Sequence, residues 1–192
     1  MTAISSTTLR LRVLGPPELV DDAGRTPPGL GWGKPLALLC YLAVRGEARR
    51  DEVVDLLWRD VDEDKARNAF RQALHRLRSA LGDYVIPHDR DRLRLSPSAQ
   101  LTIDVVEFEL HARARRLDRA VALYGGDFLE STELAEPPFD HWVEQERNRL
   151  RAQFRQLLQD AVLDATAGGQ WAEAIAPEFQ ITRLLANNVA DA

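Results

Sequence analysis

The chain has 192 residues, of which 45% are hydrophobic and 29% charged, a balance typical of folded globular proteins. No apolar run approaches the ~20 residues that a membrane-spanning helix needs, and residues 1–8 lack the basic flank and apolar centre of a signal peptide. Cys40 is the single cysteine, which excludes an internal disulfide framework and fits a reducing compartment. The composition therefore predicts a cytoplasmic protein that does not enter the membrane.

Charge is distributed unevenly along the chain, whose formal net charge is -5. Residues 1–100 contain 16 Lys and Arg against 14 Asp and Glu, whereas residues 101–192 contain 9 against 16. Residues 65–94 alone contain 8 basic and 3 acidic residues, a local charge of +5. A basic segment inside an acidic protein indicates a localised contact with nucleic acid.

The first half of the chain predicts short strands, three helices and a hairpin. Apolar and polar residues alternate at its start, which is typical of a strand. Pro35 suits the first turn of an apolar helix that Gly46 ends, and Gly82 ends the third helix. The predicted elements are strands at residues 9–14 and 18–20, helices at 34–45, 51–58 and 65–81, and a hairpin of residues 84–86 and 92–95.

The second half predicts helices only. Pro137 and Pro138 suit the entry of a long amphipathic helix, and two glycines after it precede a last helical pair. The helical segments are residues 105–117 and 119–124, with a break near Asp118, and then residues 139–166.

This order predicts a protein that is mainly α with small β elements. Ser96, Pro97 and Ser98 form a plausible boundary. We therefore expect a winged helix-turn-helix domain at residues 1–98 and an all-α domain of helical hairpins at residues 99–192.

The third predicted helix has two chemically different sides. At about 100° per residue, its apolar residues share one side, and no acidic residue occurs between Arg67 and Leu81. Arg can bind phosphate or guanine, Asn and Gln can bind adenine, and a helix fits the ~12 Å major groove. The apolar side is Ala66, Phe70, Ala73, Leu74, Leu77 and Leu81; the other side is Ser79 together with the predicted DNA contacts Arg67, Asn68, Arg71, Gln72, His75 and Arg78.

The predicted hairpin adds three arginines, Arg90, Arg92 and Arg94, which alternate with other residues and so share one face. On a wing they would reach the phosphate backbone or the adjacent minor groove. The alternative to DNA binding is that the polar side of the helix is ordinary solvated surface. The arginines of the hairpin would then only hinder its edge strand from pairing with other strands.

These segments resemble the SARP family of transcriptional activators. The first half is similar to the OmpR-type winged helix, and the second to the bacterial transcriptional activator domain. The resemblance covers residues 9–176 and is carried by LRLRVLG (9–15), GKPLALLCYLA (33–43), DEVVDLLW (51–58), ARNAFRQALHRLRSALG (66–82), IDVVEFE (103–109), ALYGGDFLE (122–130) and HWVEQERNRLR (141–151).

The resemblance implies sequence-specific binding of double-stranded DNA through the third helix and the wing, often by a homodimer on direct repeats. It also implies activation through RNA polymerase, and a tetratricopeptide-like second domain that supports dimerisation. Two departures stand out. Residues 89–92 read DRDR where the family usually has glycines, and the chain stops near the second repeat, so residues 99–192 are expected to be a truncated domain, from a fragment or a minimal member.

The connection between the second and third helices is acidic. In the OmpR-type proteins that the chain resembles, this connection faces polymerase. We therefore predict that its acidic residues contact RNA polymerase, while at least one of them caps the third helix. They are Asp60, Asp62, Glu63 and Asp64.

Other chemistries have little support in the sequence. No Gly-rich phosphate loop, nucleophile elbow or zinc-binding histidine pair occurs, so neither an enzyme nor a cofactor is predicted. The four histidines are scattered, and Cys40 lies in an apolar run, so no metal site is expected. The remaining alternative is a protein-interaction module whose winged helix no longer binds DNA and whose repeats dock a partner.

Overall fold

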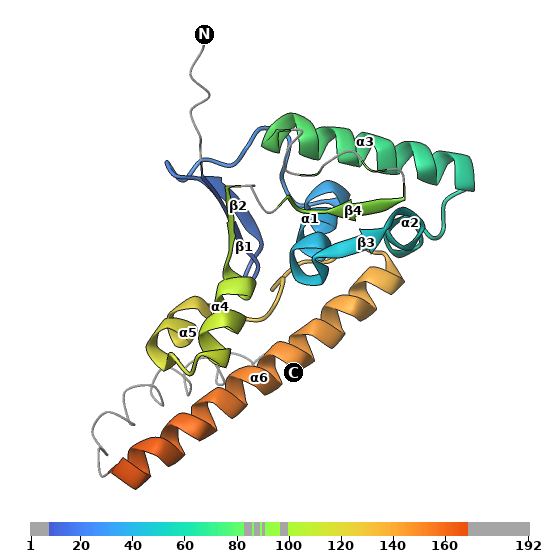
Figure 1. Cartoon of the computed structure of the whole chain (residues 1–192). Coiled ribbons are helices and arrows are strands. Elements are labelled where there is room, and N and C mark those ends of the chain that lie inside the picture. The colour runs from blue at the N-terminus through green and yellow to red at the C-terminus, as the bar shows by residue number, and fades with distance from the viewer. Residues whose placement is uncertain (1–7, 83–85, 87–88, 90, 97–99, 169–192) are drawn as a thin grey trace.

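The computed structural model describes residues 8–82, 86, 89, 91–96 and 100–168, with side chains described as far as residue 163. It is mainly helical with small strands, as predicted. In Figure 1, α3 and α6 lie on opposite sides of α1 and α2. The elements are β1 (Leu9–Arg12), β2 (Glu18–Asp21), α1 (Lys34–Arg45), β3 (Glu47–Arg49), α2 (Arg50–Leu57), α3 (Glu63–Leu81), β4 (Arg92–Arg94), β5 (Leu101–Ile103), α4 (Asp104–Arg113), α5 (Leu117–Leu123) and α6 (Pro137–Gly168).

Strand β1 is the centre of a three-stranded sheet in the order β2-β1-β5. Its alternating pattern buries Leu11 and exposes Arg10 and Arg12. It pairs antiparallel with β2 and parallel with β5, where Leu11 lies opposite Ile103. The sequence does not predict β5, because three residues are too few to show a period. Through β5 the sheet includes residues on both sides of Ser96–Ser98.

The helix-turn-helix follows the predicted boundaries closely. α1 is buried along Leu36–Ala43 and ends at Gly46, whose φ of 75° suits glycine. α3 begins two residues earlier than predicted, because Asp62 caps it: its side chain accepts a hydrogen bond from the backbone N–H of Asp64 at 3.3 Å.

The wing strand β4 has a partner that the sequence does not predict. β4 pairs antiparallel with β3, and Ala48 lies opposite Leu93, both buried. Residues 84 and 85 of the predicted hairpin lie outside the described residues. β3 escapes prediction because Glu-Ala-Arg has low strand propensity and forms a strand only in tertiary context.

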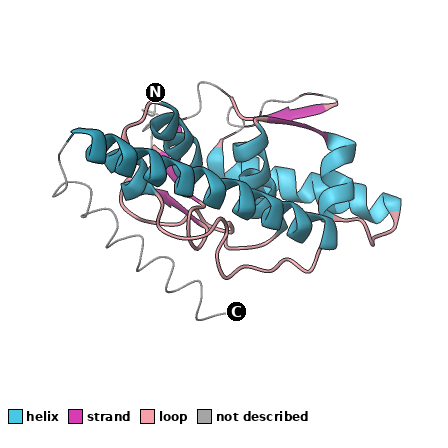
Figure 2. Cartoon of the chain, turned by 90° about the horizontal axis from the view of Figure 1, so that it is seen from below, coloured by secondary structure: helices cyan, strands magenta, loops and turns pink. Residues whose placement is uncertain are grey.

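The second half consists of α4, α5 and the long α6, which begins at Pro137 as the paired prolines predict. The expected break falls at residues 114–116, slightly before Asp118. Tyr124 stacks on Phe154 with ring centroids 4.1 Å apart, which holds the end of α5 against α6. Seen from below, α6 crosses the front of the molecule (Figure 2).

A buried carboxylate joins the two halves. Asp104, the first residue of α4, accepts hydrogen bonds from the backbone N–H groups of Val13 (2.8 and 2.9 Å) and Leu14 (3.0 Å). It also accepts from the N–H of Val105 at 2.7 Å. Burial raises the pKa of Asp104, and the three N–H groups oppose that shift. The start of α4 is therefore fixed to the end of β1.

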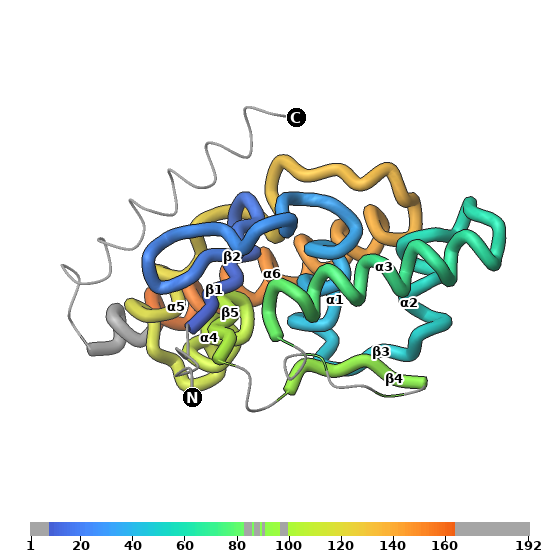
Figure 3. Tube along the Cα trace, turned by 90° about the horizontal axis from the view of Figure 1, so that it is seen from above, coloured from blue at the N-terminus to red at the C-terminus, as the bar shows by residue number. Residues whose placement is uncertain are grey.

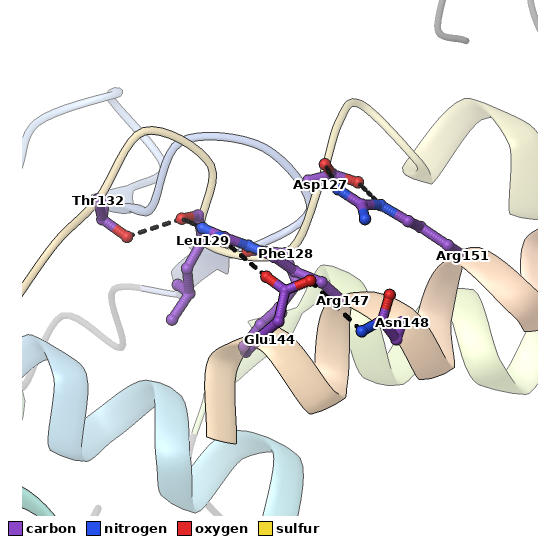
Figure 4. Close-up of polar contacts among 8 residues, drawn as sticks. All are labelled: Asp127, Phe128, Leu129, Thr132, Glu144, Arg147, Asn148 and Arg151. Atoms are coloured by element: carbon purple, nitrogen blue, oxygen red, sulfur yellow. Dashed lines mark hydrogen bonds and ion pairs between the residues drawn. The ribbon is translucent and has the colours of Figure 1, made fainter. Parts of the chain in front are cut away.

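Residues of the GGDFL and HWVEQERNRLR segments form a second connection. The guanidinium of Arg147 donates to the carbonyl oxygens of Phe128 (2.8 Å) and Leu129 (2.7 Å), and Nε of Arg151 donates to Asp127 at 2.7 Å (Figure 4). The loop held in this way pairs with the first half, since Leu129 N–H donates to the carbonyl of Val13 at 2.8 Å. One continuous core of buried side chains runs from β1 to α6.

Candidate nucleic-acid interface

Helix α3 turns its predicted apolar side inward, and all six residues of that side are buried. Phe70 meets Trp58 edge to face, with ring centroids 6.1 Å apart. These contacts prevent α3 from rotating about its axis, so its outer side is presented in one orientation.

The outer side of α3 is open to solvent. Seen from above, α3 lies in front of α1 and α2 (Figure 3). Arg78 differs from its neighbours: it is half-buried, and its Nε donates to the carbonyl of Ile86 at 2.9 Å. The exposed side chains are Arg67, Asn68, Arg71, Gln72, His75 and Ser79.

The arginines on this side differ in their surroundings. Arg67 forms an ion pair with Glu63, one turn earlier, at 2.5 Å, with side chains that are 61% and 75% exposed. Such an exposed pair stabilises a protein by about 0–1 kcal/mol, so a phosphate can replace the carboxylate. Within the described part of the chain, Arg71 has neither a hydrogen bond nor an ion pair.

Two surface hollows lie on either side of Arg71. One lies between α2 and α3 and is lined by both signs of charge, including Asp55, Asp64 and Arg67. The other lies along the second half of α3 and includes His75. Arg50 and Arg71 line both hollows. Helix α3, which is narrow enough for the major groove of DNA, therefore has a surface hollow on either side of Arg71.

The wing presents two of its three predicted arginines. Arg92 and Arg94 are exposed on β4, on either side of the buried Leu93, and Arg92 forms an ion pair with Glu47. Arg90 lies outside the described residues.

A side chain closes the turn before β4, where the resemblance to the SARP family leads us to expect glycines. The carboxylate of Asp89 accepts hydrogen bonds from the backbone N–H groups of Asp91 (3.0 Å) and Arg92 (3.3 Å). These bonds lower the pKa of Asp89. An aspartate that binds the backbone two residues on can make a tight turn without glycine.

The acidic connection divides into structural and exposed parts. Asp62 caps α3, as predicted for one of these residues, and Glu63 pairs with Arg67. Asp60 and Asp64 are exposed. Capping of α3 therefore explains why an acidic residue stands at position 62. Among the described residues, no capping contact explains the acidic residue at position 60.

Sequence reasoning missed Arg50, which contacts both α3 and the wing. Its ring contact is with Phe70, at 5.8 Å from the guanidinium carbon to the ring centroid, and its Nη2 donates to the carbonyl of Asp89. Arg50 lies outside the basic segment of residues 65–94, so the local charge pattern gives no signal for it.

Three further observations concern metal binding, the cysteine and the membrane. No cluster of metal-binding side chains occurs among the described residues. Cys40 is fully buried in α1, and burial raises the pKa of its thiol. Among the same residues, no helix is both long and apolar enough to cross a membrane.

Known proteins similar to this chain include a domain family and a solved structure. Residues 104–185 match the family model of the bacterial transcriptional activator domain. The solved structure of Mycobacterium tuberculosis EmbR in complex with a low-affinity phosphopeptide is similar in fold, with a TM-score of 0.70 and 22% identity. The similarity covers 92% of this chain and 50% of the EmbR chain, so the chain spans about half the length of that relative. No curated protein matches it significantly.

Proposed function

We propose that this chain is a transcriptional regulator of SARP type that binds double-stranded DNA through α3 and the wing, which its fold and its match to the bacterial transcriptional activator domain support. The observation that carries the proposal is the geometry of α3, whose apolar side is buried while its Arg, Asn, Gln and His side chains are exposed. A helix anchored in this way can enter the major groove without disturbing the core.

The side chains divide by position. Asn68, Arg71, Gln72 and His75 occupy the centre of the exposed side and would meet base edges. The arginines nearer the rim would bind phosphates and fix the register, and β4 would lie along the backbone or the adjacent minor groove. These are Arg67, Arg78, Arg92 and Arg94, and Arg90, which lies outside the described residues, is proposed as a further phosphate contact.

We further propose that the chain activates transcription. Residues 1–98 would carry the DNA contacts and residues 99–192 the activator contacts, with a homodimer on direct repeats. The acidic residues would face RNA polymerase; they are Asp60, Asp62, Glu63 and Asp64. DNA phosphates would repel these carboxylates, whereas the surface of a protein partner need not be negatively charged.

The test uses the full chain and a duplex selected from a random-sequence pool. If ~4–6 phosphates are contacted, log K should fall against log salt with a slope of about -4 to -5. Arg71→Ala should weaken binding by about 1–3 kcal/mol. The matched control is Arg119→Ala, which removes the same charge from an exposed position on α5. Equal effects of the two substitutions would contradict the proposal.

The acidic second half favours one other function, a protein-interaction module that does not bind DNA. Residues 101–192 contain 9 basic and 16 acidic residues. If the chain is such a module, the wild-type protein should bind DNA negligibly at every salt concentration. It also predicts that Arg71→Ala and Arg119→Ala behave alike.

A further inference from the structure

Arg50 lies where three parts of the proposed DNA-binding surface meet. It is the first residue of α2, and its backbone N–H donates to the carbonyl of Asp91 at 3.0 Å, next to the β3–β4 ladder. Its side chain reaches the wing turn, where Nη2 donates to the carbonyl of Asp89. Its guanidinium also lies over the ring of Phe70 on α3. One side chain thus contacts both the wing and the recognition helix.

These contacts restrict the guanidinium more than an exposed arginine is restricted. Arg50 is half-buried, and its Nε is buried without a hydrogen-bond acceptor among the described residues. The neighbouring Arg49 has a side chain that is 72% exposed and lies 4.0 Å from Asp51. Because burying an unpaired donor is costly, the position of Arg50 calls for an explanation that Arg49 does not need.

The chemistry of arginine suits a connector between a ring and a carbonyl. Its planar guanidinium can stack on an aromatic face while a hydrogen atom in the same plane binds an oxygen. A lysine ammonium is a compact charge and cannot hold a fixed plane in this way. Phe70 is itself held by Trp58, so the plane has a rigid support.

We propose that Arg50 is a positioning residue for DNA binding, which holds the wing residues Asp89, Asp91 and Arg92 at a set distance from α3. With that distance fixed, Arg94 on the wing and Arg71 on α3 would reach the same duplex together. The proposal rests on the proposed function, because it presumes that α3 and the wing both contact DNA.

A double-mutant cycle tests the positioning role. The variants are Arg50→Ala, Arg94→Ala and their combination, in the full chain, with the duplex selected by the wild-type chain. In the wild-type background, Arg94→Ala should weaken binding about fivefold to tenfold. In the Arg50→Ala background the same substitution should change binding by less than about twofold, because the wing is no longer held in reach.

Arg49→Ala is the matched control, since it removes an adjacent arginine that touches neither Phe70 nor Asp89. In its background Arg94→Ala should keep its full effect. Arg50→Lys should behave like Arg50→Ala and serves if the alanine variant does not fold. An Arg94→Ala effect of equal size in the wild-type, Arg50→Ala and Arg50→Lys backgrounds would overturn the proposal.

A measurement without DNA separates this proposal from the proposed function. Amide hydrogen exchange at Asp91 and Arg92, whose N–H groups bind Asp89, should become faster in Arg50→Lys than in Arg49→Ala. Unchanged exchange would overturn the positioning role whether or not DNA is bound. A wild-type chain that binds no duplex, with exchange that responds as expected, would instead defeat the proposed function alone.

Discussion

Substitution of Asp104 by alanine should destabilise the whole chain, because its carboxylate joins the first and second halves. The change leaves the N–H groups of Val13 and Leu14 without their acceptor, and both residues are buried. A buried donor left unpaired costs about 1–3 kcal/mol, so the two together predict a loss of about 2–6 kcal/mol in the free energy of unfolding. Asp104→Asn keeps one acceptor oxygen and should lose less.

Urea unfolding followed by tryptophan fluorescence measures this loss. Glu107→Ala is the matched control, because Glu107 is an exposed carboxylate in the first turn of the same helix. It should cost only the helix-dipole contribution, about 0.3–1 kcal/mol. If Asp104→Ala lost no more than Glu107→Ala, the carboxylate would not be what joins the two halves.

Three further predictions concern the core, a turn and the acidic connection. Phe70→Ala should cost about 3–5 kcal/mol of unfolding free energy in urea, because the ring is buried against Trp58; a loss below about 1 kcal/mol would contradict the packing of α3. Gly15→Ala should lower the melting temperature, since its φ of 123° strains any L-residue, whereas Gly31→Ala, in open space, should not. Replacing Asp60 and Asp62 together by Ser preserves a cap on α3. It should reduce transcription from the target promoter in a reconstituted assay without weakening DNA binding, and unchanged transcription at saturating protein would show that the connection only links two helices.

The two sides of α3 could be predicted from the sequence because a helix repeats every 3.6 residues. The six residues expected to be buried, from Ala66 to Leu81, are the six that the structure buries. The hydrophobic period and the capping residues are local properties of the sequence, so they can be recognised without knowledge of the tertiary fold. The buried surface of α3 therefore follows from spacing alone.

Strands β3 and β5 could not be predicted, for the opposite reason. Each has three residues, and each exists because a distant strand supplies its partner: β4 for Glu47–Arg49 and β1 for Leu101–Ile103. The role of Arg50 could not be predicted for the same reason, because its partners Phe70 and Asp89 lie 20 and 39 residues away along the chain. Periodicity carries no information about such pairs.

A series of cation and ring contacts extends from the second half of the chain to α3. Glu136, just before α6, forms an ion pair with Lys34 at the start of α1. The Lys34 ammonium lies 5.4 Å from the centroid of the Trp58 ring, and Trp58 contacts Phe70. Cation–ring contacts contribute about 0.5–1 kcal/mol when exposed and more when desolvated. Since Lys34 and Trp58 each take part in two of these contacts, a displacement of Glu136 or of Phe70 must break at least one of them. The orientation of α3 therefore depends on the second half of the chain as well as on the helix-turn-helix.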